Sequence, residues 1–217
     1  KLHYPFASPD QLRWILAPTT ALVEFVSGTR FHFESFAGYM SSDRKFLIAA
    51  SCAGVNFLIA SFLMLALRRL WQNRNGKTSW SFIPLAAVCA FATTLVANTV
   101  RIAFALWMQR TSFETSWLRR DQIHRLEGIV GYFAFLLLLF LLVETASKSR
   151  SSTSKLLLFP VVIYYLITLL IPFASLLIGR GTNGTELGEH SFVVLLVPLM
   201  FVLPVALYHR LRAQPNA

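Results

Sequence analysis

Residues 46–67 read FLIAASCAGVNFLIASFLMLAL and form a continuous apolar run. No charged side chain interrupts it. A bilayer core of about 30 Å needs roughly 20 apolar residues in a helix, which rises about 1.5 Å per residue. The stretch therefore predicts a helix that crosses a membrane.

Four more apolar runs approach or exceed this length. They are Trp80–Trp107, Ile129–Ala146, Leu156–Ile178 and Ser191–Tyr208. A shorter run, Leu12–Ser27, contains Arg13, Pro18 and Glu24 and is typical of an interfacial or partly inserted helix. The predicted fold is an all-α polytopic transmembrane bundle of five spanning helices, with this short amino-terminal helix in addition.

Composition supports one membrane-embedded domain over residues 1–217. The chain is 55% hydrophobic and only 14% charged, which is too apolar for an ordinary soluble domain. Its net charge of +10 comes from Lys and Arg placed mainly between the apolar runs, a pattern that favours lipid headgroups as partners and not nucleic acid. We expect residues 46–146 to carry the first three spanning helices and an outer loop, and 156–208 a carboxyl-terminal helix pair.

Basic loops predict the orientation. Arg68–Ser79, Ser147–Lys155 and the tail after Tyr208 contain Lys or Arg but no acid, which is typical of cytoplasmic segments. Residues 1–45, 108–128 and 179–190 then lie outside a cytoplasmic (inner) membrane, and the carboxyl terminus lies in the cytoplasm. Residues 30–45, where aromatic and polar residues alternate, fit either an outer hairpin or a loop on the headgroups.

Three polar residues reach similar depth near the outer interface in this arrangement. Cys52 is expected about six residues, or about 9 Å, below the outer end of its helix, and Arg101 about as far below the end near Trp107. His124 lies in the outer loop just above them. An arginine within a membrane helix costs several kcal/mol unless it snorkels to the surface or faces a polar cavity, so Arg101 is the strongest clue to a site.

Neighbouring polar residues extend this candidate site. Asn56 and Asn98 lie one turn from Cys52 and Arg101 and predict a hydrated pocket between the two helices. Asp121 or Glu127 is placed to orient His124 if the loop is helical. Small residues at 128 and 131, both glycine, would let that helix pack closely on a neighbour.

The other cysteine fits a structural role. Cys89 lies about 18 Å along the helix from Arg101, which makes a disulfide with Cys52 geometrically implausible, and Cys89 is typical of a small apolar filler. A nearby cation and histidine instead favour a reactive thiolate at Cys52. The five histidines show no zinc-ligand spacing, and we expect neither a metal nor a cofactor.

Three short motifs carry a resemblance to a known family. They are SCAGVNF at residues 51–57, NTVRI at 98–102 and HRLEG at 124–128. Their order and their positions near predicted helix ends resemble the exosortase/archaeosortase family of multi-pass membrane cysteine transpeptidases, and the first motif is most similar to the exosortase K subgroup. The resemblance covers about residues 19–132, and the rest of the chain matches only as apolar helices.

The resemblance implies a thiol peptidase or transpeptidase with Cys52 as nucleophile, His124 as proton-transfer partner and Arg101 as third essential residue. It implies substrates that are exported proteins with a carboxyl-terminal sorting motif, a transmembrane helix and a basic tail. Their acyl group would pass to water or to an amine on a lipid or glycan.

Other functions remain open at the level of sequence. An anion-binding transporter or channel subunit would use Arg101 without any thiol chemistry. A quinone-linked thiol oxidase would need paired outer cysteines, which the chain does not offer. A purely structural membrane subunit needs none of these residues.

Overall fold

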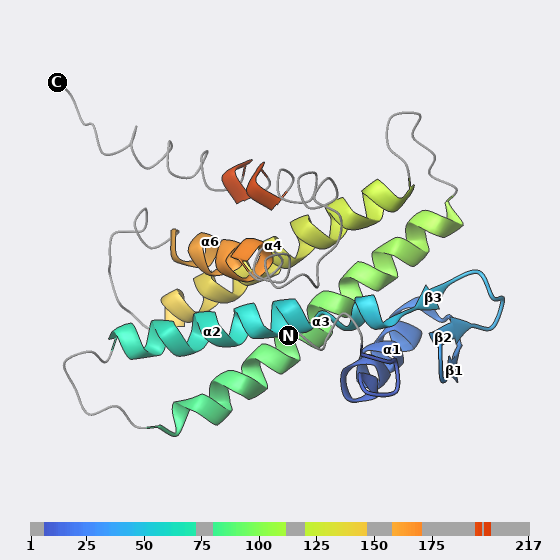
Figure 1. The fold of residues 1–217 in the computed structure, drawn as a ribbon, viewed down its shortest axis with the longest axis horizontal. Helices are drawn as coiled ribbons and strands as arrows, with labels where there is room; N and C mark the ends of the chain where they lie inside the picture. The colour runs from blue at the N-terminus through green and yellow to red at the C-terminus, as the bar shows by residue number, and fades with distance from the viewer. Residues whose placement is uncertain are drawn as a thin grey trace.

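The computed structural model describes residues 7–72, 80–111, 120–146, 158–170, 194–196 and 198–200, and its helices form a bundle with a small sheet at one end (Figure 1). The helices are α1 (Arg13–Ser27), α2 (Val55–Gln72), α3 (Phe82–Arg110), α4 (Arg120–Ala146) and α6 (Leu158–Tyr165). A 3₁₀ turn, η2 (Ala50–Ala53), precedes α2, and a π-helical segment, η3 (Leu166–Leu170), follows α6.

Three helical segments are long and apolar enough to cross a membrane. They are Ala50–Gln72, Phe82–Arg110 and Leu126–Thr145. Only parts of the two predicted carboxyl-terminal spans fall on described residues: α6 and η3 cover Leu158–Leu170, and residues 194–196 and 198–200 are helical. Three of the five predicted spans are therefore confirmed as helices of sufficient length.

Three predicted boundaries are wrong. The loop expected from Arg68 begins later, because α2 continues to Gln72. The helix expected over Phe46–Leu67 begins only at Val55, because the preceding apolar residues form a strand and the turn η2. The outer loop expected over residues 108–128 is shorter, because α3 continues to Arg110 and α4 already begins at Arg120. Apolar residues fit a strand, a turn or a helix, so composition alone does not place these boundaries.

The helices alternate in direction. In Figure 1, α2 and α4 run away from the sheet and α3 runs back toward it. Helix α1 packs across α3 near the sheet, and α6 packs against α2 and α4. We call the two ends of the bundle the sheet end and the Arg68 end, after the residue near the last turn of α2.

A three-stranded antiparallel meander forms the sheet: β1 (Phe31–Glu34), β2 (Gly38–Ser41) and β3 (Leu47–Ile48). The hairpin reading of residues 30–45 is confirmed, whereas β3 was not predicted. The prediction of an all-α fold is wrong, because these three strands add a small sheet to a mostly helical chain. The Gln109 amide donates to the Lys45 carbonyl (2.8 Å), and Arg110 donates to Thr29 Oγ1 (2.7 Å). These bonds hold the sheet against the end of α3.

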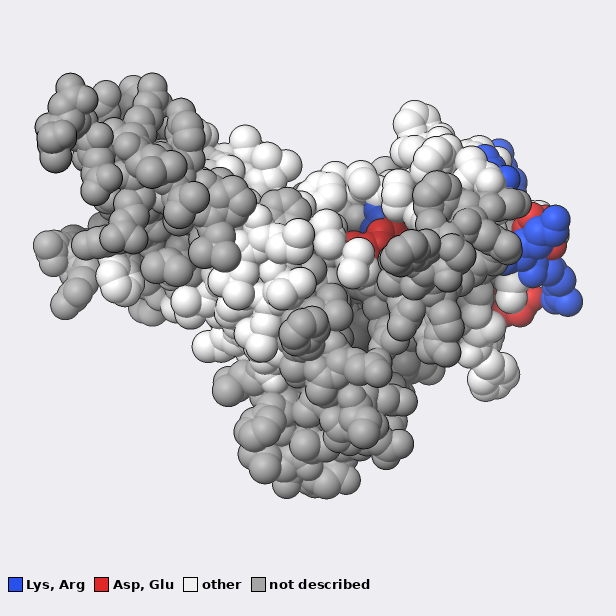
Figure 2. Space-filling model, turned by 90° about the horizontal axis from the view of Figure 1, so that it is seen from above, with Lys and Arg blue, Asp and Glu red and all other residues white. Residues whose placement is uncertain are grey.

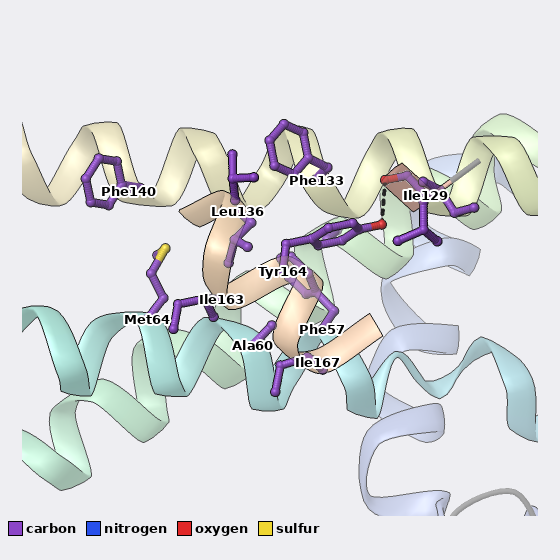
Figure 3. Packing of buried hydrophobic residues seen from close by; sticks show 13 residues of the cluster. Phe57, Ala60, Met64, Ile129, Phe133, Leu136, Phe140, Ile163, Tyr164 and Ile167 are labelled. Carbon is purple, nitrogen blue, oxygen red and sulfur yellow. Dashed lines mark hydrogen bonds between the residues drawn. The ribbon is translucent and has the colours of Figure 1, made fainter. Parts of the chain in front are cut away.

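Stripes of apolar side chains at helical spacing bury the core between α2, α4 and α6 (Figure 3). Figure 3 shows the α4 stripe Ile129, Phe133, Leu136 and Phe140 facing Tyr164 and its neighbours on α6. The Tyr164 hydroxyl donates to the Ile129 carbonyl (3.4 Å). This packing fixes where the sheet-end residues of α4 lie relative to α2.

The described outer surface of the helices is largely apolar. Side chains of α3 such as Leu85 and Val88 are each 65% exposed. In Figure 2 the charged side chains that are drawn in colour gather at the sheet end, apart from one small group in the middle of the view, among uncharged described residues. Extended apolar surface of this kind is typical of helices that contact lipid.

Candidate functional site

Cys52 lies in the turn η2, directly before α2 and at the sheet end. Its backbone N–H donates to the Ala49 carbonyl (2.9 Å), and its side chain is buried, with 5% exposed. Gly54 follows with φ of +66°, a left-handed conformation that ends the turn and lets α2 start at the next residue. The prediction that Cys52 lies six residues inside a helix is wrong, because the helix starts after it.

Asn98 of α3 fixes this turn from the side. Its side chain is fully buried, and Nδ2 donates to the Ala53 carbonyl (3.0 Å). Its Oδ1 accepts a hydrogen bond from the Tyr132 hydroxyl (2.8 Å). A Cβ at Gly54 would lie 2.5 Å from Asn98 Oδ1 and 3.0 Å from the Tyr132 hydroxyl oxygen, so only glycine fits between these groups.

Arg101 lies one turn further along α3 and is also buried, with 8% exposed. Its guanidinium carbon is 5.3 Å from the centre of the Tyr132 ring, within the range of a cation–π contact. Cys52 is a hydrogen-bonding neighbour of the guanidinium. The Glu127 carboxylate of α4 interacts electrostatically with the guanidinium as well. The side chain therefore faces protein, and it does not snorkel from the helix end.

Two nitrogen donors on one edge of this guanidinium are buried. Nε and Nη2 make no hydrogen bond with any residue that the structure describes. These two donors lie on the same edge of a planar group, the arrangement that binds a carboxylate or another oxyanion through two parallel bonds. The site therefore has a positive donor edge beside a thiol.

Tyr132 was missed by the sequence analysis, although it joins the other groups. Its ring stacks on Phe57 of α2 (5.0 Å between ring centres), and its hydroxyl and ring contact Asn98 and Arg101 of α3. Positions 124, 128 and 132 are four residues apart, so they share one face of α4. This spacing is the signal that points from the predicted His124 to Tyr132.

Two predicted site residues have side chains outside the part of the chain that the structure describes. The side chains of His124 and Asp121 fall outside the described residues, and their roles remain predictions. The α4 backbone does begin early enough to include both positions, so the condition under which Asp121 or Glu127 would orient His124, a helical segment, is met. Position 124 lies one turn before Gly128, toward the sheet end.

The remaining predicted residues differ in their placement. Asn56 is half-buried, and its Oδ1 finds no hydrogen-bond partner in the described part of the chain. Gly128 does allow close approach, since a Cβ there would lie 3.7 Å from Arg101 Nη1, whereas a Cβ at Gly131 would meet no described atom within 4 Å. Cys89 is exposed on α3, unlike Cys52.

Comparison with known protein families, curated proteins and solved structures finds no match for this chain.

Proposed function

We propose that this protein is a membrane cysteine peptidase or transpeptidase with Cys52 as its nucleophile. The observation that carries the proposal is the convergence of η2, α3 and α4 on one buried spot. There Cys52 meets the guanidinium of Arg101, whose donor edge makes no hydrogen bond with the described residues. A thiol beside a positioned cation fits nucleophilic catalysis better than a packing role.

The reaction follows from these groups. The Cys52 thiolate attacks the scissile carbonyl, and the developing oxyanion accepts hydrogen bonds from Arg101. The C–N bond breaks, His124 gives its proton to the leaving amine, and a thioester remains on Sγ. An acceptor amine or water then attacks the thioester and loses a proton to His124, and the C–S bond breaks to release the Cys52 thiolate.

The substrate class comes from the resemblance in the three motifs. Exported proteins with a carboxyl-terminal sorting motif, one transmembrane helix and a basic tail would present their scissile bond at the membrane surface. We place the site at the outer face of a cytoplasmic membrane, because the predicted cytoplasmic loops are basic and free of acid. A lipid or glycan amine is the acceptor in a transpeptidation, and water is the acceptor in hydrolysis.

The test is co-expression with tailed reporter substrates. Wild type and the Cys89→Ala variant are expected to shorten the reporter, whereas Cys52→Ala is expected to leave it intact at equal expression. Cys89 is the matched control because it is the other cysteine of the chain and is exposed on α3. Equal processing by Cys52→Ala and wild type would reject the assignment.

A second candidate, an anion-binding transporter or channel subunit, is favoured by the same donor edge of Arg101. It makes no use of the thiol. Anion flux into proteoliposomes that depends on Arg101 and survives Cys52→Ala, together with no reporter cleavage, would select this candidate over the peptidase.

A further inference from the structure

We propose that Asn98 and Tyr132 form a positioning relay that orients the Cys52 turn for reaction. The proposal rests on the peptidase function proposed above. Neither residue has to touch the substrate, because the relay acts through the backbone of η2. It runs from the Tyr132 hydroxyl to Asn98 Oδ1 and from Asn98 Nδ2 to the carbonyl of Ala53, the residue after Cys52.

The direction of the relay follows from donor and acceptor chemistry. The Ala53 carbonyl only accepts, so the Asn98 amide must present Nδ2 to it and Oδ1 to the other side. The Tyr132 hydroxyl donates to that Oδ1 and so selects this orientation of a fully buried amide. Without the hydroxyl, a buried acceptor loses its partner, and the orientation of the amide is no longer fixed.

Tyr132 also contacts the cation. Its ring lies 5.3 Å from the Arg101 guanidinium carbon and stacks on Phe57 of α2. One side chain of α4 thus sets the place of the thiol turn and of the guanidinium beside it. Reacting atoms must meet within about 3–3.5 Å and at the right angle, so an error of about 1 Å in either group is enough to slow the reaction.

The experiment compares Tyr132→Phe with Tyr164→Phe. Both changes remove one phenol hydroxyl, and Tyr164 is a buried, hydrogen-bonded tyrosine of α6 that lies outside the relay. Asn98→Ala and the double variant Asn98→Ala/Tyr132→Phe complete the set. Reporter cleavage gives kcat and KM, and thermal unfolding in detergent gives Tm.

A second readout does not depend on cleavage. In a Cys89→Ala background, N-ethylmaleimide reacts with Cys52 alone, because the chain has only these two cysteines. The thiol is 5% exposed, so release of its turn is expected to raise the alkylation rate. The rate is measured on the 217-residue chain in detergent, at one pH.

Tyr132→Phe is expected to lower kcat about 10-fold with KM within about twofold, the loss typical of one buried hydrogen bond that acts on the transition state. It is also expected to raise the alkylation rate several-fold, whereas Tyr164→Phe changes neither quantity. The double variant should be no worse than Asn98→Ala, because both changes break one relay.

Three results would overturn the relay: equal behaviour of Tyr132→Phe and Tyr164→Phe, losses that multiply in the double variant, or a change confined to KM. If the wild type cleaves none of the tailed reporters, the proposed function fails. The alkylation rates then decide the relay by themselves, with unchanged rates in Tyr132→Phe and Asn98→Ala rejecting it.

Discussion

Arg68 and Glu144 form a bidentate ion pair that joins α2 to α4 at the end of the bundle opposite the candidate site. Arg68 Nε and Nη2 donate to the two carboxylate oxygens of Glu144, the second bond measuring 2.9 Å, and each side chain is 10% exposed. The two helices run in the same direction, so this pair fixes one end of both, and the contacts around Tyr132 fix the other.

Removal of one partner is expected to destabilise the protein strongly. Arg68→Met leaves the Glu144 carboxylate buried without its cation, which typically costs about 3–5 kcal/mol. The measurement is thermal or denaturant unfolding in detergent. Arg69→Met is the matched control, because Arg69 is the next residue on the same helix and is exposed.

The double variant Arg68→Met/Glu144→Leu is expected to recover most of the lost stability, since no charge is then left unpaired. If the double variant is as unstable as Arg68→Met, the attraction between Arg68 and Glu144 itself stabilises the protein, in addition to avoiding an unpaired buried charge. Equal stability of Arg68→Met and Arg69→Met would contradict the buried pair itself.

Alanine substitutions at three glycines distinguish the cost of backbone strain from the cost of a steric clash. Gly28 has φ of +68° with open space around its Cα, Gly54 has φ of +66° with Asn98 and Tyr132 in the way, and Gly131 lies in a helix with open space. Gly28→Ala is expected to cost about 1–2 kcal/mol of stability from strain alone. Gly54→Ala should cost clearly more, and Gly131→Ala should leave stability unchanged or raise it by up to about 1 kcal/mol.

Unfolding midpoints of the three variants test this order. Gly54→Ala should also abolish reporter processing, because its Cβ displaces the Asn98 amide from the Cys52 turn. Similar midpoints for Gly28→Ala and Gly54→Ala would show that the turn relaxes around an added methyl group and that the close contact is unimportant.

The three long helices could be predicted from the sequence because a run of about 20 apolar residues has few other stable structures. The burial of Arg101 could be anticipated for the same reason, since a charge within such a run must find protein or water. The start of α2 could not be predicted: Phe46–Ala53 is as apolar as the helix that follows, and only Gly54 marks the change.

Two contacts of the bundle were hidden in the sequence for a different reason. Tyr132 lies in an apolar helix, where a tyrosine looks like ordinary core until its hydroxyl is seen to meet Asn98. Arg68 follows an apolar run and was read as a loop charge, yet it pairs with Glu144, 76 positions further along the chain. Pairings between distant residues depend on how helices pack, which one sequence does not give.

The proposed orientation is tested by labelling with a membrane-impermeant maleimide in intact cells. In a cysteine-free background, a cysteine at Ser35, an exposed residue between β1 and β2, is expected to react, whereas one at Ser79 in the basic loop is expected to react only after lysis. The reverse pattern would put Cys52 and Arg101 on the cytoplasmic side and remove the argument for exported substrates.

The last prediction concerns the guanidinium of Arg101 and separates its shape from its charge. Arg101→Lys keeps a cation near Cys52 but loses the planar fork formed by Nε and Nη2. If that edge binds the oxyanion, Arg101→Lys should lower kcat almost as much as Arg101→Ala, by about 10²–10³, the usual effect of losing one positioned oxyanion donor. Arg110→Lys is the control, because Arg110 is an exposed arginine at the end of the same helix.

Reporter cleavage under saturating substrate measures the effect on kcat, and Tm in detergent detects any collapse of the bundle. Near-wild-type cleavage by Arg101→Lys would reject the fork and leave Arg101 as a simple charge beside the thiol, since a charge effect depends mainly on distance. A large drop in Tm for Arg101→Lys would instead assign Arg101 to the packing of α3 on α4, because its guanidinium lies over the Tyr132 ring and beside Gly128. A lysine ammonium keeps the positive charge at that ring but cannot stack flat on it, so the loss of Tm is expected to be small and the loss of kcat large.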